Sequence, residues 1–163
     1  MYPWVICCRQ KSFQARQIMF ELLLPMLIRF EGVVLRPYLC PAGIPTIGIG
    51  STVYENGVKV KLTDPPITRE RAIELCRITV ERDYLPAVMS LCPELDSPER
   101  VAAIVDFTYN LGVSALRTST LRKKINARSW DEVPAQLNRW VHSSSGVLSG
   151  LVARRKFEGL AFI

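Results

Sequence analysis

The sequence predicts an α+β fold, with a small N-terminal lobe that carries a β-hairpin and a larger helical C-terminal lobe. Between residues 45 and 62, apolar and polar residues alternate around recurring glycines, which is typical of short strands. After Pro65-Pro66 the apolar residues recur with a helical period to the end of the chain. The 163 residues, of which 48% are hydrophobic, are enough for one globular domain with a buried core. A cleft between the two lobes is the expected location of a site.

The most apolar run, Ile18–Phe30, precedes the predicted hairpin. It contains Glu21 and Pro25 and is shorter than the roughly twenty apolar residues that cross a bilayer, so no stable membrane span is predicted. A weak interfacial anchor is the minority interpretation. A proline in the first turn and Gly32 just past the end indicate a short helix from Pro25, with Glu31 in its last turn.

The hairpin is predicted over residues 45–62, with Asn56-Gly57 as its turn and a glycine-rich first strand. Thr68 is the expected N-cap of a helix that runs to about Tyr84. Ser97-Pro98 is expected to begin the next long helix, and Gly112 to end it.

Four to six packed helices are expected in the C-terminal lobe. Ser129 to Glu132 matches a capping box, which predicts a helix that contains Leu137 and Trp140. The serine-rich residues 143–146 are predicted to form a loop, followed by a last helix from about Leu151.

The charge and the cysteines restrict the possible functions. Lysine and arginine outnumber aspartate and glutamate by 21 to 15, which suits an anionic partner such as a nucleic acid, a lipid surface or a cell-wall polymer. Five cysteines without a C-x-x-C spacing, and one histidine, His142, argue against a zinc site. A cysteine hydrolase would have only the distant His142 as its base.

Three polar side chains are expected to converge at one edge of the hairpin. Glu31 lies at a helix end, Cys40 in the following loop, and Thr46 at the start of a strand. The partial negative charge of the helix end disfavours a second negative charge, which suits a carboxyl that protonates a leaving oxygen. Cys40 and Thr46 could then hold or activate a water molecule. Gly48 and Gly50 would let a bulky ligand approach the strand.

The segment FEGVVLRPYLCPAGIPTIGIGST resembles the active-site segment of the phage lysozymes, the endolysins of glycoside hydrolase family 24. In that pattern a glutamate is followed after eight residues by aspartate or cysteine, and after five more by a threonine that opens TIGxG. Glu31, Cys40 and Thr46 satisfy both intervals, and Tyr38 stands where the family has an aromatic residue. The segments DFTYNLGVSALRTSTLRKKIN, LNRW and GLVARRKFEGL resemble later parts of the family, over roughly residues 20–162 in all.

The resemblance implies a lysozyme-like fold and hydrolysis of the β-1,4 bond between N-acetylmuramic acid and N-acetylglucosamine in bacterial peptidoglycan, with cell lysis and phage release. It implies no metal and no cofactor, no nucleic-acid partner, and a monomer. Residues 20–163 would be the catalytic domain, and residues 1–19 an extension of unknown role, of which residues 1–16 are poorly specified. The protein is expected in the host bacterial cytoplasm before lysis, and at the cell wall after release or export.

Residue roles follow from the same resemblance. Glu31 would be the general acid, with Thr46 and Cys40 positioning the attacking water in an inverting reaction. Substrate contacts are expected at Tyr38, Gly48, Gly50, Tyr109 and Thr120. Arg154 and Arg155 match the family's arginine pair, which either reaches toward Glu31 or lies at the surface.

Three alternatives remain open at this point. One is a non-catalytic basic module that binds cell wall or nucleic acid. A second makes Asp106 the acid in place of Glu31. The third is regulatory: a disulfide from Cys7 or Cys8 to Cys40 would block the site in an oxidising compartment.

Overall fold

The computed structural model describes residues 3–143 and 146–163, with side chains described for residues 13–142 and 146–163. Its contacts divide the chain into two compact units. The smaller unit is Leu24–Ala87, and the helical unit combines Met1–Leu23 with Val88–Ile163. The fold is lysozyme-like: a mostly helical body with a small antiparallel two-stranded sheet, as the sequence predicts.

The elements of the described residues are given in chain order, with η1 a π-helical turn and η2 and η3 short 3₁₀ turns. They are α1 (Pro3–Glu31), β1 (Val34–Leu39), β2 (Pro45–Gly48), α2 (Arg69–Thr79), η1 (Val80–Tyr84), α3 (Leu85–Leu91), α4 (Pro98–Leu111), α5 (Val113–Thr118), α6 (Thr120–Asn126), η2 (Trp130–Glu132), α7 (Val133–Leu137), β3 (His142–Ser143), β4 (Gly146–Val147), α8 (Ser149–Gly159) and η3 (Leu160–Phe162).

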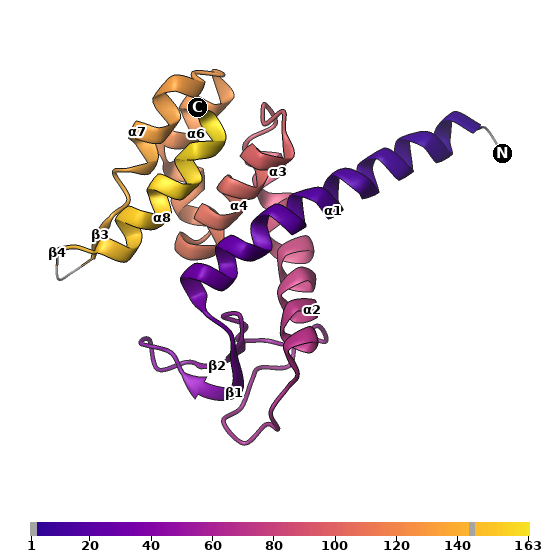
Figure 1. The fold of residues 1–163 in the computed structure, drawn as a ribbon, viewed down its shortest axis with the longest axis vertical. Coiled ribbons are helices and arrows are strands. Elements are labelled where there is room, and N and C mark those ends of the chain that lie inside the picture. The colour runs from indigo at the N-terminus through magenta and orange to yellow at the C-terminus, as the bar shows by residue number, and fades with distance from the viewer. Residues whose placement is uncertain (1–2, 144–145) are drawn as a thin grey trace. The chain divides into compact units, whose positions relative to one another are not determined.

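Helix α1 is one unbroken helix of 29 residues (Figure 1). The prediction of a short helix that starts at Pro25 is therefore wrong. Residues 3–16, which were expected to be poorly specified, belong to this helix, whereas residues 1–2 lie outside the described part of the chain. The role of residues 1–19 stays a prediction. Pro25 lies inside the helix, where it removes one backbone hydrogen bond. Burial of Leu23, Met26 and Leu27 around it offsets that loss. Among the described residues, no helix combines the length and the apolar character needed to cross a membrane.

In the smaller unit the two-stranded sheet joins residues 34–39 to residues 45–48, whereas the predicted hairpin lies wholly within residues 45–62. β2 pairs antiparallel with β1, and Tyr38 faces Thr46 across the pair. The turn at Asn56-Gly57 does form, since the Gly57 amide donates to the Tyr54 carbonyl at 3.0 Å. The isolated bridge of Val53 with Lys59 flanks it, in place of regular strands. The expected strands are short because Gly48 and Gly50 adopt positive φ angles of 69° and 80°, which end the extended backbone.

Helix α2 begins where its N-cap predicts. The Thr68 hydroxyl accepts the Arg71 amide at 3.1 Å. Ala72, Leu75 and Cys76 form the buried face of the helix. The helical path that the sequence predicts to about Tyr84 continues as the π-helical turn η1, a feature that interrupts regular helices in short pieces.

Helix α4 is the core of the helical unit. Its eight residues from Val101 to Thr108 are all buried, and it contacts α5, α8 and η3. Ser97 caps its start by accepting the Arg100 amide, and Gly112 at φ 84° ends it, both as predicted. A helix buried on every side is typical of the centre of a helical bundle.

The end of the helical unit differs from the prediction in two places. The capping box does not form, because Ser129 makes no side-chain cap and the Glu132 carboxylate instead pairs with Lys124 of α6 at 2.7 Å. Trp140 lies beyond the end of α7. Residues 142–143 and 146–147 form a small hairpin in place of a plain loop, and residues 144–145 lie outside the described part of the chain. Helix α8 then begins at Ser149.

Candidate active site

Glu31 is the last residue of α1. The helix stops there because Gly32 adopts a φ of 76°, a left-handed conformation that glycine reaches without strain, and the Gly32 amide donates to the Ile28 carbonyl at 3.1 Å. The Glu31 side chain is half-buried. Its carboxyl group therefore stands at the helix terminus that the sequence predicts, with access to solvent.

Cys40 and Thr46 lie on either side of the tight turn that joins β1 to β2. The Gly43 amide donates to the Cys40 carbonyl at 2.8 Å, and the Cys40 amide donates to the Ile44 carbonyl at 3.1 Å. Thr46 is buried, whereas Cys40 is half-buried. The turn thus brings the thiol and the hydroxyl together at one end of the hairpin.

The environment of Cys40 favours its thiolate. The backbone amides of Ile44 and Ala42 lower the pKa of the Cys40 thiol, and the Thr46 hydroxyl acts in the same direction. That hydroxyl also donates to the Ile44 carbonyl at 2.9 Å, and its single proton serves one acceptor at a time. The two amides therefore carry most of the effect.

The negative charge of Glu31 raises the pKa of two tyrosines, Tyr38 and Tyr84. Burial raises the pKa of Tyr38, and the negative charges of Cys40 and Glu31 raise it further. Tyr38 therefore lies within electrostatic reach of both Cys40 and Glu31. Burial, Asp83 and Glu31 raise the pKa of Tyr84 in the π-helical turn η1. Tyr84 is not among the predicted site residues, because the apolar period of its helix carries no sign of the π-helical turn.

Gly48 has a packing role. A Cβ atom built on it would contact Ala72 Cβ of α2 at 3.4 Å and Ile67 at 3.6 Å, so helix α2 and its preceding segment occupy the space beside this strand. The missing side chain lets α2 approach closely. Substrate contacts at Gly48 and Gly50 stay predictions.

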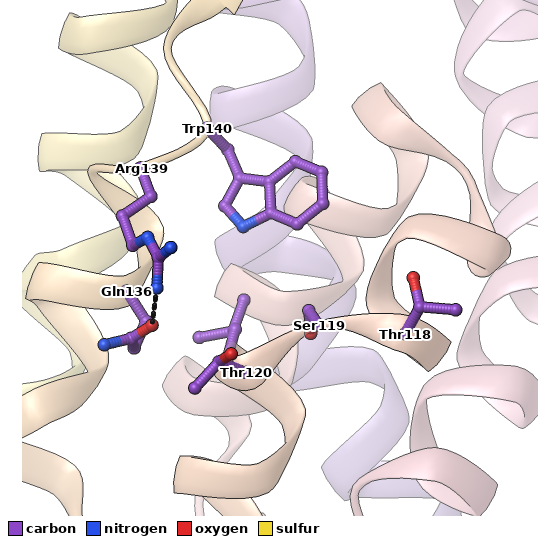
Figure 2. Close-up of a pocket in the computed structure, with 7 residues that line it drawn as sticks. Thr118, Ser119, Thr120, Gln136, Arg139 and Trp140 are labelled. Atoms are coloured by element: carbon purple, nitrogen blue, oxygen red, sulfur yellow. Dashed lines mark hydrogen bonds between the residues drawn. The ribbon is translucent and has the colours of Figure 1, made fainter.

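The remaining predicted residues, Tyr109, Thr120, Arg154 and Arg155, belong to the helical unit. Thr120 is exposed at the start of α6 and lines a pocket of about 300 Å³ (Figure 2). The other lining residues are Thr118, Ser119, Leu121, Gln136, Arg139 and Trp140. Figure 2 shows Arg139 beside Gln136, to whose Oε1 it donates at 3.3 Å.

This pocket combines an aromatic ring, a guanidinium group and hydroxyls. The Trp140 ring is held edge to face against Phe107 of the core, with the ring centroids 5.5 Å apart. Only Thr120 of its lining is a predicted site residue. Arg139 and Trp140 fall within the LNRW segment, whose resemblance to the family was the one sequence signal for them.

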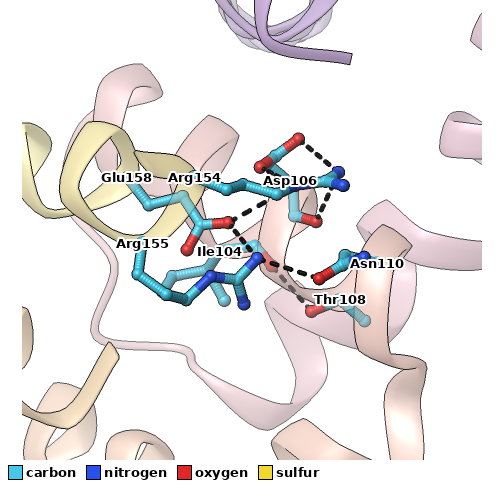
Figure 3. A network of polar contacts seen from close by, with 7 residues as sticks. All are labelled: Ile104, Asp106, Thr108, Asn110, Arg154, Arg155 and Glu158. Atoms are coloured by element: carbon cyan, nitrogen blue, oxygen red, sulfur yellow. Dashed lines mark hydrogen bonds and ion pairs between the residues drawn. The ribbon is translucent and has the colours of Figure 1, made fainter. Parts of the chain in front are cut away.

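Arg154 and Asp106 form an ion pair in the interior of the helical unit (Figure 3). Arg154 donates from Nε to Asp106 Oδ2 at 2.8 Å and from Nη2 to Oδ1 at 2.9 Å. Asp106 is completely buried. Its carboxylate is therefore committed to the arginine and does not contact solvent, which argues against its use as an alternative acid.

Arg155 and Glu158 lie in the same network, and both are completely buried. Arg155 Nη2 lies 2.8 Å from Glu158 Oε1 and donates to Asn110 Oδ1 at 3.1 Å. Burial raises the pKa of the Glu158 carboxyl, contact with Asp106 adds to this, and Arg155 opposes it. The surface alternative for the arginine pair is thus wrong, because both side chains are buried and hold α8 against α4.

In the described part of the chain, no three His, Cys, Asp or Glu side chains are grouped as a metal site would require. The proposed disulfide between Cys40 and Cys7 or Cys8 is not tested, because the side chains of residues 3–12 lie outside the described ones.

Comparison with known proteins places this geometry in a family. The Phage lysozyme family model matches residues 28–158. An endolysin of Acyrthosiphon pisum secondary endosymbiont phage 1 is 31% identical over 146 residues, covering 85% of this chain and 93% of the relative. A SAR-endolysin of Escherichia phage Mu is 29% identical, covering 85% of this chain and 77% of the relative.

Solved structures agree. An endolysin from Escherichia coli O157:H7 phage FAHEc1 aligns with a TM-score of 0.79 at 29% identity, covering 87% of this chain and 90% of that one. A point mutant of the lysozyme of phage P22 aligns with a TM-score of 0.75 at 28% identity, covering 85% of this chain and 92% of that one. The chain therefore belongs to the phage lysozyme family, and its function is that of a muramidase, the hydrolysis of peptidoglycan.

Proposed function

We propose that the chain is an endolysin in which Glu31 is the general acid on the glycosidic oxygen between N-acetylmuramic acid and N-acetylglucosamine. The observation that carries the proposal is the grouping of Glu31, Cys40 and Tyr38 within electrostatic reach, with Thr46 across the hairpin from Tyr38. A half-buried carboxyl at a helix terminus is accessible to substrate, as a general acid must be.

Cys40 and Thr46 would position the attacking water. The lowered pKa of Cys40 increases the fraction of the residue that is present as thiolate, and a thiolate accepts a hydrogen bond from water better than a neutral thiol does. Thr46 can hold the water or orient the thiolate through its hydroxyl. Attack on the face opposite the leaving group would invert the anomeric carbon.

Substrate contacts in the helical unit would include Tyr109 and Thr120. The pocket at Thr120 supports this, because an aromatic ring and hydroxyls suit a sugar and Arg139 suits an acidic group of the wall polymer. The predicted cleft between the lobes, the monomeric state and the absence of a nucleic-acid partner stay proposals.

The chain would act on the wall after release or export from the host bacterial cytoplasm. Support for export comes from relatives named SAR-endolysins, among them the one of phage Mu. The SAR-endolysin of Bacteriophage PS119 is another, and it is 31% identical to this chain over 131 residues. The non-catalytic binding module is not favoured, since the family model spans residues 28–158.

The test is clearance of bacteria stripped of their outer membrane, together with mass spectrometry of the released fragments. The wild-type chain should release fragments with muramic acid at the reducing end. Glu31→Gln should reduce clearance at least about a hundredfold, since removal of a positioned acid costs two to four orders of magnitude. Glu21→Gln, an exposed change in the same helix, is the matched control and should clear at the wild-type rate. Retained activity in Glu31→Gln would refute the assignment of the acid.

A further inference from the structure

The interior of the helical unit holds two arginine–carboxylate pairs that differ in geometry (Figure 3). Arg154 donates to both carboxylate oxygens of Asp106, from Nε and from Nη2. Arg155 approaches Glu158 through Nη2 alone, at 2.8 Å from Oε1. In the described part of the chain, neither oxygen of Glu158 accepts a hydrogen bond, and Nε and Nη1 of Arg155 make none. The two pairs are therefore not equally suited to hold a buried negative charge.

Glu158 is poorly placed to be ionised. Its side chain is completely buried, and a buried carboxylate needs hydrogen bonds to replace the water that it loses. The contact with Arg155 supplies attraction without such a bond, and Arg154 Nε lies 3.9 Å from Oε1, beyond hydrogen-bond distance. A neutral carboxyl group loses less when it leaves water, so burial favours the protonated form.

A proton on Glu158 would have an acceptor in Asp106. The Asp106 carboxylate lies close enough to Glu158 to raise its pKa, by hydrogen bonding as well as by charge. A carboxylate oxygen can accept two hydrogen bonds, so the bonds from Arg154 leave capacity on Asp106 for a further donor. The carboxyl hydrogen of Glu158 can therefore be donated to Asp106.

Arg155 has partners besides Glu158. Its Nη2 donates to Asn110 Oδ1 at 3.1 Å, and its guanidinium carbon lies 5.0 Å from the centre of the Phe107 ring. Burial lowers the pKa of Arg155 and raises the pKa of Glu158, so for both partners the loss of solvent outweighs their attraction. Because arginine stays protonated far above neutral pH, the carboxyl group is the partner that becomes neutral.

The elements packed against Glu158 supply a small set of charged groups. Helix α8 packs mainly against α4, α7 and η3. The groups that face Glu158 from α4 and α8 are Asp106, Arg154 and Arg155, whereas Lys156 of α8 is exposed. The sequences of α7 and η3 contain no titratable side chain. An extra proton in the network is therefore held by the two carboxyl groups, Glu158 and Asp106.

We infer that the helical unit contains a buried proton-binding site, in which Glu158 is a neutral acid that donates to Asp106 while Arg155 keeps its charge. In the unfolded chain a glutamate ionises near about pH 4.3, whereas in the folded chain the pKa of Glu158 is raised. The stability that this group contributes is therefore complete in acid and is lost as the pH rises from about 4 through the raised pKa.

The decisive substitution is Glu158→Gln, because an amide resembles the neutral acid in shape and cannot ionise. Urea denaturation gives the unfolding equilibrium constants of the wild type and the variant from about pH 4 to about pH 8. The ratio of the wild-type constant to that of Glu158→Gln should rise with pH, by up to about tenfold per pH unit, until Glu158 ionises in the folded state. A ratio that stays flat or falls would overturn the inference, because an ionised Glu158 paired with Arg155 gives that result.

The matched control is Glu99→Gln, at an exposed glutamate of α4. The ratio of the wild-type constant to that of Glu99→Gln should not show this rise, because an exposed carboxyl group keeps its contact with water in the folded state. An equal rise for Glu99→Gln would overturn the assignment of the proton to Glu158.

If Glu158→Gln does not fold, carbon-13 NMR of the Glu31→Gln variant, labelled at the glutamate carboxyl carbons, decides the question without the proposed catalytic acid. One carboxyl carbon should keep the chemical shift of a neutral acid at about pH 6, where ordinary glutamates are ionised. A spectrum of ionised glutamates alone would overturn the inference. Neither measurement uses activity, so the proposed function fails separately, if the wild-type chain hydrolyses no peptidoglycan fragment.

Discussion

Arg154 of α8 donates hydrogen bonds to both carboxylate oxygens of Asp106 of α4, at 2.8 and 2.9 Å, and so connects the two helices. Both side chains are almost completely excluded from solvent. The sequence places them 48 residues apart, and each alone resembles a surface charge or a catalytic candidate. In the folded protein they compensate one another, which makes the pair a structural element of the helical unit.

Breaking this pair should destabilise the protein strongly. Arg154→Met leaves Asp106 buried without its partner and should cost about 3–5 kcal/mol in the free energy of unfolding. The double change Arg154→Met with Asp106→Leu should cost less than the single one, because no charge is left unpaired. Urea denaturation followed by circular dichroism gives both values.

The control for this prediction is Arg128→Met. Arg128 pairs with Glu94 at 2.7 Å, but the arginine side chain is 61% exposed. Its loss should change stability by at most about 1 kcal/mol, since exposed ion pairs contribute little. Equal losses for Arg128→Met and Arg154→Met would show that burial does not determine the strength of these pairs.

Two glycines in the helical unit should respond to alanine in opposite directions. Gly112 adopts φ 84° and ψ 157°, a region reserved for glycine, so Gly112→Ala should cost about 1–3 kcal/mol even though no atom lies within 4 Å of the added Cβ. Gly150 lies in the first turn of α8, also with no atom within 4 Å and without a positive φ. Gly150→Ala should stabilise by about 0.4–1 kcal/mol. Thermal unfolding measures both, and a stabilised Gly112→Ala would contradict the strain argument.

Substitution of Cys40 should shift the pH range of activity. The thiol acts through its thiolate, whose population rises as the pH increases through the lowered pKa of Cys40. An aspartate is already ionised above about pH 4, so Cys40→Asp should stay active and keep its activity to lower pH than the wild type. Cys40→Ala should lose only part of the rate.

The measurement is the pH profile of fragment hydrolysis for the three proteins. A Cys40→Asp enzyme without activity would show that the thiol has a specific function, and a fully active Cys40→Ala would remove the residue from the mechanism.

Cys40 and Cys92 should differ in reactivity toward iodoacetamide. Burial raises the pKa of Cys92 to about 11, whereas Cys40 is half-buried and its pKa is lowered. At about pH 7.5 Cys40 should be alkylated more than about a hundredfold faster, because the thiolate is the reacting species. Peptide mapping by mass spectrometry separates the two sites, and denaturant should abolish the difference. Comparable alkylation rates of Cys40 and Cys92 in the folded protein would contradict the half-buried position of Cys40 and the burial of Cys92.

Local signals in the sequence predicted the starts and ends of several helices correctly. Thr68, Ser97 with Pro98, and Gly112 each act on the residues beside them, so no distant contact is needed for the prediction to hold. The capping box at Ser129 failed because Glu132 has a better partner, Lys124, in a neighbouring helix. Pro25 failed as a helix start for the same kind of reason, since burial of its neighbours outweighs a local cost.

The sequence by itself determined the spacing of Glu31, Cys40 and Thr46, because these residues lie within one short segment whose helix end and turn are set by nearby glycines. It also determined the helical character of most of the chain after Pro66. Only the tertiary structure decided which strand pairs with β2, where Tyr84 lies relative to Glu31, and which carboxylates hold Arg154 and Arg155. These relationships depend on packing between segments far apart in the chain, where the loss of solvent, and not local backbone preference, selects each partner.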